Sequence, residues 1–169
     1  SSDGVTWTDV TASVPAAVRT RYNQGMLVYN NRLWVIGGYN GAYLNDVWSY
    51  DGTTWTMMTA AAPWGPRATW NQVTVHDDGG GSKIWVVGAA GPAPQPRDVW
   101  WSTNGTVWTQ TTANGGWTFT DEGCATSLGS RIYVIGSGQV FSSADGTSWV
   151  NENPVGLPSR GRIDCSAIN

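Results

Sequence analysis

The chain has 169 residues, of which only 12% are charged, and it contains 22 glycines and 12 tryptophans. This length allows one domain with a sizeable core, and the abundance of aromatic residues excludes a disordered chain. The net charge is −3 and the nine basic residues are scattered, which argues against nucleic acid as a partner. No apolar run is long enough to span a membrane. The single lysine, and a surface expected to be rich in Ser, Thr, Asn and Gly, predict a secreted or cell-surface protein.

The chain opens with the phrase Ser-x-Asp-Gly-x-x-Trp, which returns three times, once with Asn in place of Asp. The phrases end at Trp7, Trp55, Trp108 and Trp149, at intervals of 48, 53 and 41 residues. Asp-Gly or Asn-Gly between β-prone residues predicts a hairpin turn in which both residues take positive φ. A period of roughly 40 to 50 residues built from strands predicts the blades of a β-propeller.

Each interval between these turns contains apolar stretches that predict four strands, and we expect essentially no helix. The strands are predicted at 23–29, 32–36, 46–50 and 55–58, at 71–75, 83–87, 98–102 and 108–111, and at 123–128, 131–135, 139–143 and 149–151. The three blades then span about 19–59, 67–112 and 119–151 of a single all-β propeller segment that covers 1–169. A split blade would combine a fourth strand within 1–10 with a first strand within 160–169.

The first repeat carries the strongest family signal. Residues 31–41 combine an apolar strand with a double glycine, and Asp46-Val47-Trp48 follows before the spaced Trp55. This arrangement resembles a kelch repeat, the unit of one family of β-propellers. The glycines allow a tight bend after the second strand, and the repeated tryptophans can pack between neighbouring blades.

The later repeats keep part of this pattern. The second has Asp98-Val99-Trp100 but Ala89 in place of the second glycine, and the third has Ser137 there and no Asp-Val-Trp. The repeated turn also resembles the Asp-box of sialidase-type propellers, with one residue fewer between Asp and Gly. A distant similarity to sialidase-type and galactose-oxidase-type propellers follows from these features, and the kelch resemblance covers nearly the whole chain.

Three blades and a split one do not complete a ring of the usual four to eight blades. An open ring would expose sheet edges that are prone to association. Three arrangements fit this count: a stretch of a longer propeller, an assembly in which copies of this chain or another chain complete the ring or a filament, and a small irregular ring closed by this chain alone. The abrupt ending at Asn169 favours the first.

Arginines precede the first strand of several repeats. Arg19, Arg67 and Arg160 occupy equivalent positions, which in a propeller lie at the mouth of the central channel, and the third repeat has Phe119 there. Guanidinium groups at such a mouth can bind ligand carboxylates in bidentate fashion, as in sialidase-like sites. The structural alternative is that, as in kelch-type repeats, they bind neighbouring backbone carbonyls and hold the blades together.

Aromatic and polar loop residues form the second group of candidates. The loops that join the fourth strand to the next first strand, and the second strand to the third, share one rim of a propeller. Aromatic rings there can stack on a sugar or peptide while polar groups fix its orientation, or they can cover the edges of the blades. With the three arginines, the candidate rim residues are Tyr39, Asn40, Tyr43, Trp64, Arg97 and Trp117.

Cys124 and Cys165 lie 41 residues apart, the same interval as between Trp108 and Trp149, and are expected at one height on adjacent inner strands. They are candidates for a disulfide that joins two blades, or for two small buried thiols. The only histidine, His76, has no evident metal-binding or catalytic partners and is expected to be a polar turn residue.

We expect an extracellular, non-enzymatic module that contacts protein or glycan through this rim, without cofactor or metal. The chain offers few carboxylates for acid–base catalysis, since Glu122 and Glu152 are its only glutamates. The first alternative is a fragment of a propeller enzyme, either a sialidase-type glycoside hydrolase or a galactose-oxidase-like protein, with Asp121 and Glu122 as its acids. The second alternative is a self-assembling surface or filament protein that completes the propeller between chains.

Overall fold

Short stretches rich in apolar and β-branched residues form the strands. The strands assemble into three antiparallel sheets in the computed structural model, which describes residues 1–119 and 123–152. Each sheet has four strands in chain order and is called a blade below. Blade 1 comprises β1 (Gly25–Tyr29), β2 (Arg32–Tyr39), β3 (Tyr43–Tyr50) and β4 (Trp55–Thr59). Blade 2 comprises β5 (Val73–Asp77), β6 (Ser82–Val87), β7 (Val99–Ser102) and β8 (Thr109–Thr112). Blade 3 comprises β9 (Cys124–Leu128), β10 (Arg131–Gly136), β11 (Gln139–Ser143) and β12 (Val150–Asn151). The prediction of an all-β chain with three four-stranded sheets is confirmed.

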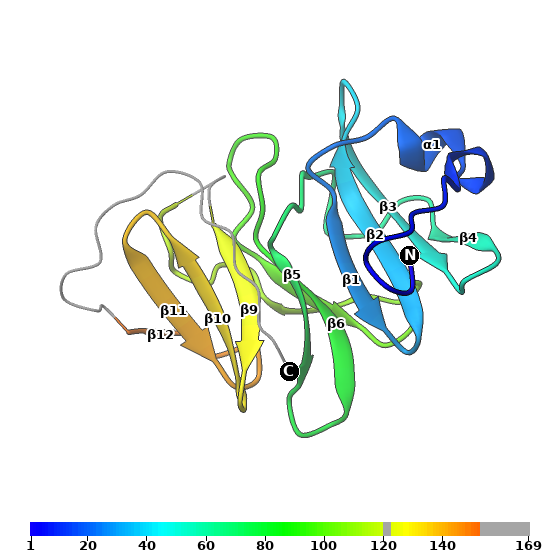
Figure 1. Cartoon of the computed structure of the whole chain (residues 1–169). Coiled ribbons are helices and arrows are strands. Elements are labelled where there is room, and N and C mark those ends of the chain that lie inside the picture. Colours follow the sequence, from blue (N-terminus) through cyan, green and yellow to red (C-terminus); the bar gives the residue numbers. More distant parts are fainter. Residues whose placement is uncertain (120–122, 153–169) are drawn as a thin grey trace.

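The three blades lie side by side with their first strands adjacent (Figure 1). Strand β5 of blade 2 contacts both β1 of blade 1 and β9 of blade 3. This arrangement is consistent with neighbouring blades of a propeller. Within residues 1–119 and 123–152 the sheets do not close into a ring. No helix in that part of the chain is long and apolar enough to cross a membrane.

The N-terminal segment differs from the prediction. Residues 1–10 contain no strand, because a strand needs a neighbouring strand to satisfy its backbone hydrogen bonds and none pairs with this segment. A 3-10 turn, η1 (Thr11–Ser13), and one turn of helix, α1 (Ala16–Arg19), follow, and they are the only helical segments in the part of the chain that the structure describes. Pro15, whose fixed φ suits the start of a helix, directly precedes α1. The first strand expected within 160–169 lies outside the described residues.

The turn between the third and fourth strands of a blade is held by the side chain of its Asp or Asn. In blade 1, Oδ1 of Asp51 accepts hydrogen bonds from the backbone N–H groups of Thr53 at 2.9 Å and Thr54 at 2.8 Å. The same pair of contacts recurs at Asp3, Asn104 and Asp145. Only the glycine of each pair takes a positive φ, so the expected turn with two left-handed residues is wrong. The Asp or Asn is needed as a hydrogen-bond acceptor instead.

In blades 2 and 3 the glycine of this turn lies against an aromatic ring of the preceding blade. A Cβ on Gly105 would be 2.2 Å from Cζ3 of Trp34, and one on Gly146 would be 2.2 Å from Cζ3 of Trp85. Trp34 belongs to β2 and Trp85 to β6, so the turn of one blade packs on the second strand of the blade before it. Since only glycine leaves room for the ring, this contact determines how closely neighbouring blades approach.

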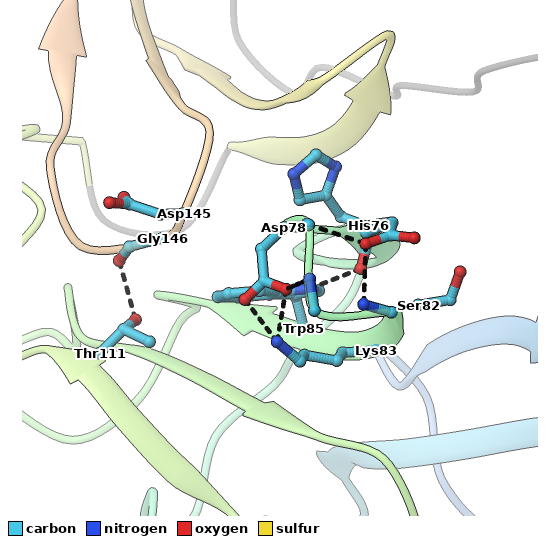
Figure 2. A network of polar contacts seen from close by, with 12 residues as sticks. His76, Asp78, Ser82, Lys83, Trp85, Thr111, Asp145 and Gly146 are labelled. Atoms are coloured by element: carbon cyan, nitrogen blue, oxygen red, sulfur yellow. Dashed lines mark hydrogen bonds and ion pairs between the residues drawn. The ribbon is translucent and has the colours of Figure 1, made fainter.

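Hydrogen bonds and apolar burial complete both junctions. Thr106 Oγ1 of blade 2 donates to the carbonyl of Met58 in blade 1 at 3.2 Å. Thr111 Oγ1 of blade 2 donates to the carbonyl of Gly146 in blade 3 at 2.8 Å, as Figure 2 shows. Each of two large apolar clusters therefore lies between two blades rather than within one sheet. The first contains Trp34, Trp64 and Trp108, and the second contains Trp85, Trp117 and Phe141.

His76 is buried between blades 2 and 3 rather than lying in an exposed turn. Its Nε2 lies 3.0 Å from the carbonyl oxygen of Ala144 and its Nδ1 lies 2.9 Å from Oγ of Ser127. A carbonyl can only accept, so in the neutral ring Nε2 donates to Ala144 and Nδ1 accepts from Ser127. The imidazole is therefore a structural link between the two blades.

Replacing Asp51 with Asn is expected to reduce the loss of stability at low pH. Hydrogen bonds from the backbone of Thr54, and from the side chain and backbone of Thr53, lower the pKa of Asp51 from its usual 3.8 to about 2. A carboxylate with a lowered pKa stabilises the fold above its unfolded pKa, and this contribution disappears as the pH falls through about 2. Asn keeps the acceptor oxygen but does not titrate. The urea midpoint of the variant should therefore change less than that of the wild type between about pH 4 and pH 2, and equal pH dependence would contradict this role.

Replacing Gly105 with Ala is expected to destabilise the fold much more than replacing Gly4 with Ala. The two glycines have nearly equal φ, 71° and 73°, so the backbone strain of an added Cβ is matched. At Gly105 the Cβ collides with Trp34, whereas at Gly4 nothing lies within 4 Å of it. We expect the free energy of unfolding to fall by about 2–5 kcal/mol for Gly105→Ala and by about 1–2 kcal/mol for Gly4→Ala in urea titrations. Similar losses would show that the ring contact does not hold the blades.

Candidate functional site

A buried ion pair occupies the predicted arginine position of blade 2. Arg67 is 2% exposed, and its guanidinium donates to both carboxylate oxygens of Asp98, at 2.6 and 3.1 Å, and to the carbonyl of Gly88 at 3.1 Å. Burial lowers the pKa of Arg67 below its ordinary value, and the Asp98 carboxylate opposes that shift. These partners all belong to blade 2. The guanidinium therefore ties the segment before β5 to the ends of β6 and β7, and it is not free to bind a ligand.

Blade 1 contains the same unit, built on Arg21 rather than Arg19. Arg21 donates to both carboxylate oxygens of Asp46 at 2.7 Å and to the carbonyl of Gly37 at 2.9 Å. Because these partners are equivalent residues of the two blades, Arg21 corresponds to Arg67. Arg19 lies two residues earlier and is exposed at the end of α1. The prediction that Arg19 is the equivalent of Arg67 is therefore wrong.

The Asp-Val-Trp motif completes these units. In blades 1 and 2 the indole N–H groups of Trp48 and Trp100 donate, at 2.7 Å, to the same carboxylate that binds the arginine. In blade 3 neither the arginine nor the motif is present, and Phe119 lies over Gly136, where an added Cβ would be 2.5 Å from the ring. Blade 3 therefore lacks both the arginine and the aspartate of the ion pair. Losing only one of them would leave a buried charge without its partner, which is costly.

Trp64 and Trp117, which the sequence placed on the exposed rim, are buried at 2% and 1% exposure. Trp64 packs edge-on against Trp108 with ring centroids 5.8 Å apart, and the Arg67 guanidinium lies 5.4 Å from its ring centroid. Trp117 packs edge-on against Trp149 at 5.2 Å. Both side chains fill junctions between blades, so neither ring is free to stack on a ligand.

Two other predicted rim residues, Tyr39 and Tyr43, meet in an open pocket of about 300 Å³ between blades 1 and 2. Their ring centroids are 5.2 Å apart, and the ring of Tyr22 lies 5.4 Å from that of Tyr39. The remaining lining residues are Asn23, Ala68, Trp70 and Ala90. None of the lining residues is charged, so this pocket, called the tyrosine pocket below, presents aromatic rings, phenol hydroxyls and one carboxamide.

The backbone that forms the tyrosine pocket is held in an uncommon conformation. The amide of Trp70 donates to the carbonyl of Asn23 at 2.9 Å, which joins the segments before β5 and β1. Asn23 has a φ of 55° and Trp70 a φ of 38°. A left-handed backbone is an outlier for a residue as bulky as Trp, and such strain is concentrated at functional sites.

The sequence reasoning missed Tyr22, Asn23 and Trp70 as members of the site. Their only signal is a shared triplet of aromatic residue, Asn and Gln at residues 22–24 and 70–72. That triplet precedes a first strand in each repeat, where the arginines drew the functional assignment. The contact between the two triplets depends on the packing of blade 1 against blade 2, which their separation in the chain does not reveal.

Two predicted rim residues lie apart from the tyrosine pocket. Arg97 is half-buried beside a second hollow of about 270 Å³, where it donates to the carbonyl of Thr118 at 3.4 Å. Asn40 is exposed between β2 and β3 and does not line the tyrosine pocket. In the part of the chain that the structure describes, no group of three or more His, Cys, Asp or Glu side chains could hold a metal ion.

Cys124 is buried and disulfide-bonded. Cys165, the other cysteine of the chain, lies outside the described residues, so the pairing of the two stays a prediction. Arg160 and the acids of the enzyme alternative, Asp121 and Glu122, also lie outside them.

Comparison with protein families identifies the first blade. Residues 20–59 match the family model described as the Kelch motif, and these residues include all four strands of blade 1. The match confirms the kelch resemblance of the first repeat. It indicates a protein-interaction or propeller module. A comparison with curated proteins found no match.

Replacing Arg67 with Ala is expected to lower the free energy of unfolding by about 3–5 kcal/mol, because it leaves the Asp98 carboxylate without its cation. Arg19→Ala is the matched control and is expected to change stability by about 0.5 kcal/mol or less, since Arg19 is exposed. Urea titration followed by circular dichroism measures both values. Wild-type stability of Arg67→Ala would rule out the structural role of this arginine.

Proposed function

We propose that the chain is an extracellular, non-enzymatic binding module of a kelch propeller that holds a neutral sugar unit of a glycan in the tyrosine pocket. The observation that carries this proposal is the uncharged aromatic lining of that pocket. The apolar face of a sugar ring packs on aromatic rings, while its hydroxyl groups pair with phenol hydroxyls and the Asn23 amide. A volume of about 300 Å³ is at the lower end for small-molecule sites and suits one sugar unit.

The charges around the tyrosine pocket favour a neutral ligand over an acidic one. Arg21 and Arg67, the buried arginines of blades 1 and 2, are each bound to both oxygens of an aspartate. The lining residues themselves include no cation that would neutralise a ligand carboxylate. An acidic sugar of the kind that sialidase-type sites bind would therefore lose hydration without gaining an ionic partner.

The lining of the tyrosine pocket also supports binding without catalysis. It contains no carboxylate, imidazole, thiol or amine that could act as an acid, base or nucleophile in this pocket. Secretion or display at the cell surface is part of the proposal, and the low content of charged residues and of lysine supports it.

A protein partner is the second candidate. The kelch motif favours it, because the motif indicates a protein-interaction module. Tyrosine is also enriched at protein interfaces, where its ring is buried while its hydroxyl stays hydrogen-bonded. An aromatic or proline side chain of the partner would then fill the tyrosine pocket.

Replacing Tyr39 with Ala tests the glycan proposal. The wild type is first screened on a glycan array, and the affinity for the best neutral glycan is then measured by calorimetry. Loss of one stacking ring should weaken binding roughly tenfold. Tyr50→Ala is the matched control, because Tyr50 stacks on Trp55 at the other end of β3 and should leave binding unchanged. The bound glycan should be recovered uncleaved.

Three results would change this conclusion. Cleavage of the glycan would favour the enzyme alternative. If no glycan binds but peptides selected from a displayed library do, and Tyr39→Ala weakens them, the protein candidate replaces the glycan. If Tyr39→Ala affects neither kind of ligand, the tyrosine pocket is not the binding site.

A further inference from the structure

The hollow of about 270 Å³ beside Arg97 lies where the loop between β6 and β7 meets the segment that follows β8. The amide of Gly115 donates to the carbonyl of Arg97 at 2.8 Å, which joins the two segments at this point. The hollow, called the arginine pocket below, shares no lining residue with the tyrosine pocket. Its lining residues are Pro94, Gln95, Arg97, Ala113 and Asn114.

Arg97 is the only charged residue in this lining, and its guanidinium is poorly paired. It donates to the carbonyl of Thr118 at a long distance of 3.4 Å. Its Nε is buried, and none of the residues that the structure describes accepts a hydrogen bond from it. Arg21 and Arg67, by contrast, each bind both oxygens of an aspartate. A buried donor without an acceptor is costly, so a ligand that supplies one to Arg97 gains binding free energy.

The two carboxamides of the arginine pocket also present donors. Oε1 of Gln95 accepts from the amide of Gly91 at 2.8 Å, and Oδ1 of Asn114 accepts from the amide of Gly116 at 3.0 Å. A backbone N–H can only donate, so these bonds determine which end of each carboxamide is the oxygen. Both oxygens are thus in use, and each side chain offers its NH2 group to a ligand.

One positive charge and two further donors, with no carboxylate in the lining, suit an anion with a single charge. Asp98 follows Arg97 in the chain, but its carboxylate is already bound to Arg67 and to the indole of Trp100. A ligand carboxylate has one charge and two coplanar oxygens that match the fork of a guanidinium. A phosphate monoester carries up to about two charges, which one arginine would not neutralise.

We propose that the arginine pocket binds the carboxylate of a small acidic ligand, with Arg97 as its ion-pair partner and the NH2 groups of Gln95 and Asn114 as further donors. Two sources share this chemistry: a free organic acid and a uronic acid unit of a glycan. Pro94 and Ala113 give the carbon skeleton of either ligand an apolar wall. This inference does not depend on what occupies the tyrosine pocket.

Nuclear magnetic resonance of the ¹⁵N-labelled chain tests the contact at the atom concerned. The Nε–H signal of Arg97, assigned by its absence from the Arg97→Lys variant, should shift when propionate or glucuronate is added. The neutral amides of the two acids, propionamide and glucuronamide, should leave it in place. Tighter binding of glucuronate than of propionate would assign the glycan source, and the reverse order would assign a free acid.

Two pairs of variants test the roles of the lining residues. Arg97→Gln should weaken binding of the preferred acid roughly 10- to 100-fold, whereas Arg19→Gln removes the same charge from an exposed site and should not affect it. Asn114→Asp keeps the oxygen that accepts from Gly116 but replaces the NH2 donor with a negative charge, so it should abolish binding. Asn40→Asp adds the same charge to an exposed turn and should leave binding unchanged. The amide spectrum verifies that each variant is folded.

Four results would overturn the proposal. The first is that neither acid shifts the Arg97 signal, and the second is that the acids and their amides bind equally well. The third is binding only by the double variant Asp121→Asn, Glu122→Gln, which would show that a carboxylate of the chain itself occupies the arginine pocket. The fourth is a shift with an acidic peptide but with neither small acid, which would assign the pocket to a protein side chain.

Discussion

Neighbouring blades can pack closely because a turn glycine of one blade lies against an aromatic ring of the blade before it. Trp34 and Trp85 lie against the backbone of the next blade only because Gly105 and Gly146 have no side chain. The main apolar clusters consequently form between sheets, and each blade relies on a neighbour for its stability.

The buried ion pairs act at the opposite end of the blades and position the tyrosine pocket. The Arg67 side chain is bound to Asp98 within blade 2, while its backbone amide and carbonyl bond to Leu44 and Gly38 of blade 1, at 2.8 and 2.9 Å. One residue thus attaches the segment that carries Trp70 to both blades. The arginine that sequence analysis considered as a ligand contact instead holds the wall of the pocket in place.

Turn residues and short apolar stretches are local signals, so the three blades could be predicted from the sequence alone. Asp51-Gly52 and its counterparts located every turn between third and fourth strands, and the predicted strands differ from the observed ones by only a few residues. The strand expected within 1–10 failed for the same physical reason: its turn forms locally, but a strand requires a neighbour.

The packing of one blade on another determines which residues are available to a ligand. A loop tryptophan has the same local pattern whether it is exposed or buried, and Trp64 became a core residue because Trp108 of the next blade packs against it. Loop position alone predicted Tyr39 and Tyr43, whereas Tyr22 and Trp70 joined them through contacts between blades that no spacing encodes. Burial depends on segments far apart in the chain, so the fold could be predicted from the sequence more completely than the site.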